Sequence, residues 1–455
     1  MNSIKSKAHF FNNPVRLIVF SFLFLILIGS VLLSLPISSK SGQFSSYINS
    51  LFVAASSTCI TGLTVYDIHS HYTFWGQLII FFLIQIGGLS LISFSTFLTL
   101  SIKHRLGLKN LKLAKEYAST DSIMNIPKLF KLIVLSTISI ELIGALIFSI
   151  RFIPKFGVAE GIWVSVFTSV SSFCGAGFDI FSRAVPSTNL SDFNNDPLII
   201  YTVCVLVIIG GLGFLVYSDL LRTRFKISKL TFHSKLVLLF SAVLVVLGTV
   251  IFFVFENNNT ATIAGMSLFE KFNASLMQSV TTRTCGYFSV PINKLFTETK
   301  LFMIFFMFIG TAPASTGGGI KITTFLVLFF TVISVIKGRN DTYLFGRTVD
   351  KKTVYKSFAI FALAFLLIII VTFIIVIFDP EVSAINALFE ATSAFGTVGL
   401  SCGITDSLHN ISKVAIIITM FCGRVGPVSM GYIFTSKNLA NTSQVISPNA
   451  KIIVG

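Results

Sequence analysis

Four short phrases of the sequence combine glycine with small and hydroxyl-bearing residues. They read TCITGLTV (58–65), FCGAGFDI (173–180), TRTCGYFS (282–289) and AFGTVGLS (394–401). Glycine adopts backbone angles that other residues avoid, so such phrases can turn several main-chain carbonyls toward one place. Rings of carbonyls replace the water shell of a cation inside a membrane, as in the four TVGYG loops of potassium channels. The phrases therefore predict cation coordination by main-chain oxygen atoms.

The four phrases are in register. Gly62, Gly177, Gly286 and Gly399 are separated by 115, 109 and 113 residues, and a bulky apolar residue stands ten positions before each. Small residues in membrane helices also allow close helix packing, which is the alternative for any single phrase. Four copies in register favour the ion pathway. The residues expected to supply its carbonyls are Ile60, Thr61, Gly62, Leu63, Gly175, Ala176, Gly177, Phe178, Thr284, Cys285, Gly286, Tyr287, Thr397, Val398, Gly399 and Leu400.

The stretch GTAPASTGGGIKITTF (310–325) interrupts a long apolar segment. Pro313 and Gly317–Gly319 do not fit a straight helix, and broken helices mark functional sites in transporters. We expect this to be the one conspicuous break, and predict a flexible gate below the carbonyl ring on the cytoplasmic side. A kink relieved by neighbouring helices is the alternative. The predicted gate residues are Gly310, Thr311, Ala312, Pro313, Ala314, Ser315, Thr316, Gly317, Gly318 and Gly319.

Several charged residues lie in apolar surroundings, where a charge is functional by default. Arg424, in FCGRVGP, is expected to repel cations or to hold the 310–319 loop, with a structural ion pair or snorkelling as the alternative. Lys321 either positions that loop or reaches the cytoplasmic interface. Arg283 is predicted to support the third phrase by bonding carbonyls or a pore-helix acid such as Glu390. Glu141 fits a buried structural group better than a proton relay.

Long apolar segments must position all of these residues. The 455-residue chain is 54% hydrophobic and 11% charged, against about 25% charged in soluble domains, and a helix of about 20 apolar residues crosses a bilayer. An all-α polytopic membrane protein with eight transmembrane helices is therefore predicted. The first span is expected to be an uncleaved anchor. The spans are Val15–Leu35, Phe74–Ile102, Leu129–Phe152, Leu198–Leu221, Leu236–Phe255, Leu301–Ile336, Phe358–Phe378 and Ile411–Phe434.

Each phrase lies between two spans, after a segment too short to cross a bilayer, which indicates a re-entrant loop. Irregular backbone at membrane depth must be buried in protein or line a watery cavity. Four outer-helix/pore-loop/inner-helix repeats around a pseudo-fourfold pore are therefore predicted. Their expected boundaries are 1–125, 126–233, 234–352 and 353–436, followed by a short cytoplasmic tail at 437–455.

The net charge of +16 comes from lysines and arginines concentrated in alternate loops. This alternation follows the positive-inside rule and places both termini and the basic loops in the cytoplasm. The charge thus reports topology, with anionic membrane lipid or an acidic partner as secondary possibilities, and argues against nucleic acid. The basic residues include Lys103, Arg105, Lys109, Lys112, Arg222, Arg224, Lys226, Lys337, Arg339, Arg347, Lys351 and Lys352.

Two other classes of protein fit less well. A membrane enzyme would need clustered His, Asp or Glu within the spans, whereas His69 and His71 fall in an outer loop and the acids are scattered. A secondary transporter built on inverted repeats is disfavoured, because all four units run in the same direction. The six cysteines have no metal-ligand spacing and read as small buried fillers.

The four repeats, GTAPASTGGGIKITTF and GRVGP together resemble the Trk/Ktr/HKT superfamily of cation transporters, and most nearly the membrane subunits of bacterial Ktr potassium uptake systems. The resemblance covers nearly the whole chain. It implies K⁺ uptake across the bacterial cytoplasmic membrane, with filter glycines at Gly62, Gly177, Gly286 and Gly399. The gate would be residues 310–319 with Arg424. A sodium-permeable or poorly selective cation transporter of the same fold is the alternative.

The same resemblance implies partners and ligands. It implies a homodimer with one pore per protomer, and a separate cytoplasmic ring of nucleotide-binding RCK subunits. Sodium dependence is common in such systems, and no covalently bound cofactor is expected. The chain departs from the family pattern where Cys174 and Gly175 replace Asn-type residues and where Tyr287 and Phe288 replace a Phe–Asn pair. Both departures bear on the preference for K⁺ over Na⁺.

Overall fold

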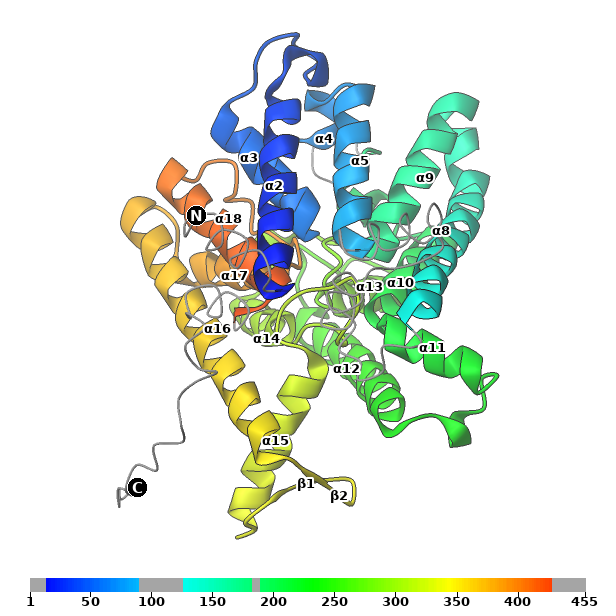
Figure 1. The fold of residues 1–455 in the computed structure, drawn as a ribbon. Coiled ribbons are helices and arrows are strands. Elements are labelled where there is room, and N and C mark those ends of the chain that lie inside the picture. Colours follow the sequence, from blue (N-terminus) through cyan, green and yellow to red (C-terminus); the bar gives the residue numbers. More distant parts are fainter. Residues whose placement is uncertain (1–13, 90–125, 182–188, 428–455) are drawn as a thin grey trace, which may run out of the picture.

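The computed structural model describes residues 14–89, 126–181 and 189–427, and these residues form mostly helices (Figure 1). The α-helices are α2 (Pro14–Ser34), α3 (Tyr47–Cys59), α4 (Ile68–His71), α5 (Phe74–Leu89), α8 (Ile126–Phe156), α9 (Val158–Cys174), α10 (Pro197–Gly211), α11 (Phe214–Arg222), α12 (Phe232–Glu256), α13 (Leu268–Thr281), α14 (Thr297–Phe308), α15 (Ile322–Ile336), α16 (Lys351–Phe378), α17 (Ala384–Gly396) and α18 (Asn410–Val425). Short 3₁₀ turns are η1 (Pro36–Ser38), η2 (Asn189–Phe193), η3 (Ile227–Lys229) and η4 (Ile292–Lys294).

The chain also forms a small hairpin that the all-helical prediction omitted. Strands β1 (Thr342–Leu344) and β2 (Arg347–Val349) pair antiparallel, with Tyr343 opposite Thr348. Phe345 and Gly346 make the tight turn, and both have positive φ. The hairpin and α15 project together from one end of the molecule (Figure 1).

Several helices are long and apolar enough to cross a membrane. Among the described residues, length and composition identify Lys131–Phe156, Phe232–Glu256 and Lys351–Phe378. The bent pair α10 and α11 would make a fourth span if counted as one. These helices support a polytopic membrane protein, while the count of eight spans stays a prediction. The ends of the second and last predicted spans, and the basic loop at 103–115, lie outside the described residues.

The fourth predicted span is broken, so the expectation of a single conspicuous break is wrong. Helices α10 and α11 meet at 90° across Leu212 and Gly213. Gly213, the residue before α11, has φ +86°, a value that glycine adopts at little cost. The run Gly210–Gly213, read as GGLG, was the local signal for this second break.

Helices α3, α9, α13 and α17, which we call the short helices, are 13 to 17 residues long and each precedes one of the four glycine phrases. Phe52, Phe167 and Phe389, the apolar residues ten positions before three of the shared glycines, are fully buried. Each of these helices packs against the long helix that precedes it: α2 with α3, α8 with α9, α12 with α13, and α16 with α17.

The helices that follow the short ones link neighbouring units. Helix α5 packs on α9, α10 on α13, α14 on α17, and α18 on α3. In each case the helix after one short helix contacts the next short helix along the chain, and α18 returns to the first. The contacts therefore form a closed ring, which brings the ends of the four short helices together.

Candidate ion pathway

The four short helices are followed by backbone of the same unusual shape. We call residues 60–63, 175–178, 284–287 and 397–400 the glycine segments. Their first residues, Ile60, Gly175, Thr284 and Thr397, have φ between 51° and 75°, and the shared glycines two positions later have φ between 66° and 92°. Alternating left-handed residues turn successive carbonyls of a segment to one side. Ile60, Thr284 and Thr397 bear this strain although they are not glycines.

The four glycine segments meet around one point. A Cβ atom added to Gly62 would lie 2.4 Å from the carbonyl oxygen of Ala176, and one added to Gly399 would lie 2.1 Å from that of Thr61. The corresponding distances are 2.5 Å from Gly177 to Cys285 and 2.9 Å from Gly286 to Val398. Each glycine thus abuts the carbonyl just before the glycine of the next unit, and the series closes on itself.

Serine hydroxyls from the short helices hold two of these segments. Ser56 Oγ accepts a hydrogen bond of 3.0 Å from Gly62 N, and Ser393 Oγ accepts one of 3.1 Å from Gly399 N. Both serines stand six positions before their glycine. The sequence analysis did not single them out, although a serine at this position in three of the four units was the available signal.

The second segment is held differently. Ser171, the serine of this unit, donates from Oγ to the carbonyl oxygen of Phe178 at 3.0 Å. The phenol of Tyr287, from the third segment, donates to the same oxygen at 2.8 Å. Two buried hydroxyls therefore bond the oxygen that was predicted to face a cation, and the role of Phe178 as a cation ligand stays a prediction.

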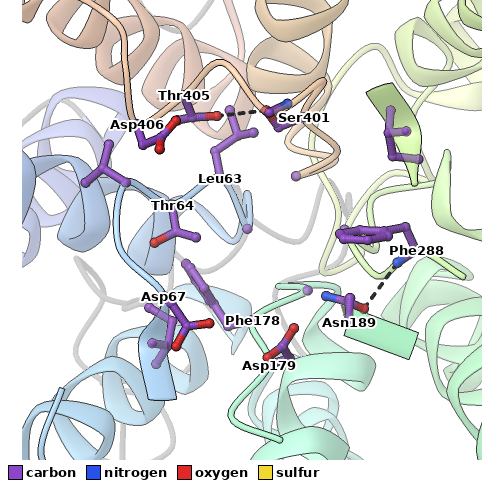
Figure 2. A pocket seen from close by; sticks show the side chains of 18 of the residues that line it. Leu63, Thr64, Asp67, Phe178, Asp179, Asn189, Phe288, Ser401, Thr405 and Asp406 are labelled. Carbon is purple, nitrogen blue, oxygen red and sulfur yellow. Dashed lines mark hydrogen bonds between the residues drawn. The ribbon is translucent and has the colours of Figure 1, made fainter. Parts of the chain in front are cut away.

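A cavity of about 460 Å³ opens at the C-terminal end of the glycine segments (Figure 2). The four shared glycines form part of its lining, together with Asp67, Asp179 and Asp406. Carboxylates around a concave mouth raise the local concentration of cations. The sequence analysis did not single out these three acids. The cavity brings them together because each follows its glycine by a few residues.

One lining residue of the cavity, Tyr66, packs against a histidine. The imidazole of His71 stacks on Tyr66 with ring centroids 3.8 Å apart, and its Nε2 lies 3.0 Å from Ser45 Oγ. Burial lowers the pKa of His71 below its ordinary value and so disfavours the protonated ring.

The loop at residues 310–319 lies at the opposite end of the glycine segments. Ile309 and Ile320 pair at its base, where Gly310 N donates to Ile320 O at 2.8 Å. Gly318 N donates to Thr397 Oγ1 at 3.0 Å, and a Cβ on Gly317 would lie 2.2 Å from Thr284 Oγ1. The loop therefore presses directly against the first residues of the third and fourth segments.

The two broken helices are hydrogen-bonded to each other. Ala312 N donates to Gly211 O at 3.1 Å, and Phe214 N donates to Ala314 O at 2.8 Å. Backbone groups that have no partner within a helix at the bend between α10 and α11 thus form hydrogen bonds with the 310–319 loop. This satisfies polar groups that would be costly if left unpaired in an apolar region.

Two cationic side chains hold the loop. Arg424 donates from Nη1 to the carbonyl oxygen of Thr316, and from Nη2 to that of Gly87 at 2.6 Å. Lys321 donates from Nζ to Gly317 O at 2.6 Å. Arg424 therefore joins α18, the 310–319 loop and the end of α5.

Arg283 and Glu390 do not bond each other, so of the two predicted kinds of partner Arg283 has a carbonyl and not the acid. Arg283 donates to Ser241 O at 2.9 Å and to Ser241 Oγ at 3.2 Å. Glu390 accepts a hydrogen bond from the hydroxyl of Thr405. The guanidinium turns outward to α12, whereas the carboxyl faces the chain beyond the fourth segment. Arg283 braces its segment against the outer helix and not through filter carbonyls.

Glu141 has partners from neighbouring helices. Gln85 Nε2 donates to its Oε2 at 3.0 Å, and Cys174 Sγ lies 3.8 Å from Oε1. The carboxyl thus ties α8 to α5 and to the end of α9, as a buried structural group would. Within the described parts of the chain, no group of three or more His, Cys, Asp and Glu is placed to hold a metal ion.

The fold and the geometry above define a helical membrane protein in which four glycine segments meet around one point. A family model described as "TrkH: Cation transport protein" matches residues 5–441, and the chain belongs to this family. The family consists of transport proteins, so the chain is a transporter and not an enzyme. The resemblance drawn from the four repeats and the glycine-rich loop is confirmed.

Relatives match over nearly their full length. The chain is 34% identical over 442 residues to Ktr system potassium uptake protein B of Bacillus subtilis, covering 97% of each chain. It is 36% identical to a protein of the same name from Vibrio alginolyticus, covering 92% of this chain and 90% of that one. It is also 34% identical, over the full length of both chains, to "Potassium/sodium uptake protein NtpJ" of Enterococcus hirae.

A solved structure shares the fold. The crystal structure of the potassium transporter TrkH from Vibrio parahaemolyticus superposes with a TM-score of 0.70 at 17% identity. The superposition covers 91% of this chain and 84% of that one.

Proposed function

We propose that this chain carries K⁺ into a bacterial cell through a selectivity filter built from the four glycine segments. The observation that carries the proposal is the closed series of contacts in which each shared glycine abuts a carbonyl of the next unit. Such a ring offers main-chain oxygens to a cation without needing a carboxylate in the filter. Relatives named as potassium uptake proteins support K⁺ as the cargo.

The filter belongs to four outer-helix/pore-loop/inner-helix units around one pseudo-fourfold axis, with the boundaries given above. The cyclic packing of the short helices supports this arrangement. Acids from three outer loops draw cations to the mouth, and the membrane potential drives them inward, at about 2.3 kcal/mol per charge for each 100 mV. Both termini lie in the cytoplasm.

The 310–319 loop is the gate. It occupies the cytoplasmic end of the filter, where Gly318 contacts Thr397. Arg424 and Lys321 hold it closed through its carbonyls. Its bonds to the bend between α10 and α11 make that bend a second moving part, which opens together with the loop.

Assembly follows the Ktr pattern. The chain forms a homodimer with one pore per protomer, in contact with membrane lipid. A separate cytoplasmic ring of RCK subunits carries the nucleotides and regulates the gate. The basic residues around the projecting hairpin, among them Arg339 and Arg347, offer that ring a docking surface.

A less selective, sodium-permeable pathway is the second candidate. It is favoured by the relative named as a potassium/sodium uptake protein and by the occupied carbonyl of Phe178.

Flux of rubidium or potassium into liposomes that contain the purified chain tests the proposal. We expect flux that follows the membrane potential and is inhibited weakly by sodium. If sodium inhibits rubidium flux as strongly as potassium does, the second candidate is favoured. Absence of any cation flux would refute both candidates.

A further inference from the structure

One carbonyl differs from its three counterparts just after the shared glycines. The residues at this level are Leu63, Phe178, Tyr287 and Leu400. The oxygen of Phe178 accepts two hydrogen bonds, 3.0 Å from Ser171 Oγ and 2.8 Å from the Tyr287 hydroxyl. Within the described residues, the other three carbonyl oxygens accept none. A carbonyl oxygen has two lone pairs, so that of Phe178 has none left for a cation.

We propose that Tyr287 is a specificity-determining residue, because its hydroxyl withholds the Phe178 carbonyl from the outer cation layer of the filter. This inference rests on the proposed function. The layer then has three carbonyl ligands, and water completes the shell of the ion on the side of the second unit. The number of coordinating carbonyls is one of the accepted sources of preference for K⁺ over Na⁺. A layer that lacks one carbonyl ligand therefore discriminates less between K⁺ and Na⁺.

Comparison among the units assigns the effect to the phenol. In the first and fourth units the serine hydroxyl accepts a hydrogen bond from the glycine N–H, as at Ser56 and Ser393. Ser171 instead donates to Phe178 O. The residues that correspond to Tyr287 are leucine or phenylalanine and carry no hydroxyl. Only the third segment can therefore place a donor against its neighbour in this way.

The phenol is held in one position. Tyr287 is fully buried, and its ring stacks on Phe181 with centroids 6.3 Å apart. The hydrogen bond also joins segments that are 109 residues apart in the chain. Because Tyr287→Phe removes a single oxygen atom and keeps this packing, the variant isolates the hydroxyl.

The test compares wild type, Tyr287→Phe and the double variant Ser171→Ala/Tyr287→Phe. Rubidium flux into liposomes, with K⁺ and Na⁺ as competitors, gives the ratio of their inhibition constants. A buried carbonyl released from its donors turns to the nearest positive charge, which is the ion on the axis. We expect K⁺ preference to rise about threefold in the single variant and about tenfold in the double variant. Tyr201→Phe, which removes a phenol bonded to Asn273 Oδ1 at 2.8 Å, is the matched control and should leave the ratio unchanged.

An unchanged ratio would overturn the inference, and so would a fall, which is the result expected if the hydroxyls only stiffen the segment. A second measurement serves variants that carry little flux. The thermal stabilisation of purified protein by K⁺ relative to Na⁺ reports binding alone, and should rise in the same order. Wild-type protein without cation flux would refute the proposed function, whereas flux with an unchanged ratio in the variants refutes this inference alone.

Discussion

The glycine segments and the 310–319 loop touch each other, yet they are held in place by different forces. In the glycine segments, main chain abuts main chain, and a single added carbon at Gly399 would meet Thr61 O at 2.1 Å. The loop is held by main-chain hydrogen bonds to the bend between α10 and α11 and, in addition, by donors on the flexible side chains of Arg424 and Lys321. Packed backbone has one arrangement, whereas a side-chain hydrogen bond can be exchanged for water. The difference suits a rigid filter beside a movable gate.

The largest effect is expected from Gly399→Ser, which tests whether the glycine segments are rigid. The substitution adds a Cβ at φ +89°, against the backbone of the first segment. We expect the preference for K⁺ over Na⁺ to fall by about tenfold or more, because the ring must distort to admit the side chain. Competitive rubidium flux measures it.

Gly42→Ser is the matched control for that variant. Gly42 has φ +68°, and nothing lies within 4 Å of an added Cβ. It therefore shares the backbone strain without the contact. If Gly399→Ser retained the wild-type ratio, the close-packed ring would not determine selectivity.

Deleting residues Thr316–Gly319 tests whether the 310–319 loop is a movable gate. The deletion removes the contacts of Gly318 with Thr397 and of Thr316 with Arg424. We expect flux in liposomes to rise by about fivefold to tenfold, as if the closed state lost about 1–1.4 kcal/mol. Loss of flux from a protein that still elutes as the wild type does would show that the loop is required for conduction and does not obstruct it.

Arg424→Gln sharpens the comparison by leaving the loop intact. A hydrogen bond from a charged donor contributes about 1.5–3 kcal/mol, and the glutamine replaces only part of it. We expect basal flux to rise by about threefold to fivefold, with the K⁺ preference unchanged, because the filter is not touched. A change in preference with constant flux would place Arg424 in the filter instead.

Arg151→Gln serves as the charge-matched control. Arg151 pairs with Asp196 at 3.0 Å, with half of its side chain exposed. Surface pairs of this kind contribute little, so its flux should equal that of the wild type.

The smallest effect is expected from Glu141→Gln. The amide keeps an oxygen for Gln85 and nearly the same volume, so the contact between α5 and α8 survives. We expect flux within about twofold of wild type and an unaltered dependence of flux on pH. A lost pH dependence would instead make Glu141 the proton-relay carboxylate that the sequence left as an alternative.

Much of this molecule could be predicted because the relevant signals are local. Backbone strain at Gly62, Gly177, Gly286 and Gly399 follows from residue type, since glycine tolerates positive φ. The break at residues 310–319 follows from a proline and three consecutive glycines. The family could be named from these motifs. The break at Gly213 was equally local, and was overlooked because the run GGLG is shorter.

What only the tertiary structure decided concerns partners from distant parts of the chain. Arg283 bonds Ser241 and not Glu390, and Tyr287 reaches the carbonyl of Phe178. The position of Asp67, Asp179 and Asp406 around one cavity was likewise decided by the tertiary structure. Sequence fixes the conformations a residue tolerates, through the sterics of its own backbone and Cβ. The partner of a side chain depends on how helices separated by tens of residues pack, and that is a property of the whole ring.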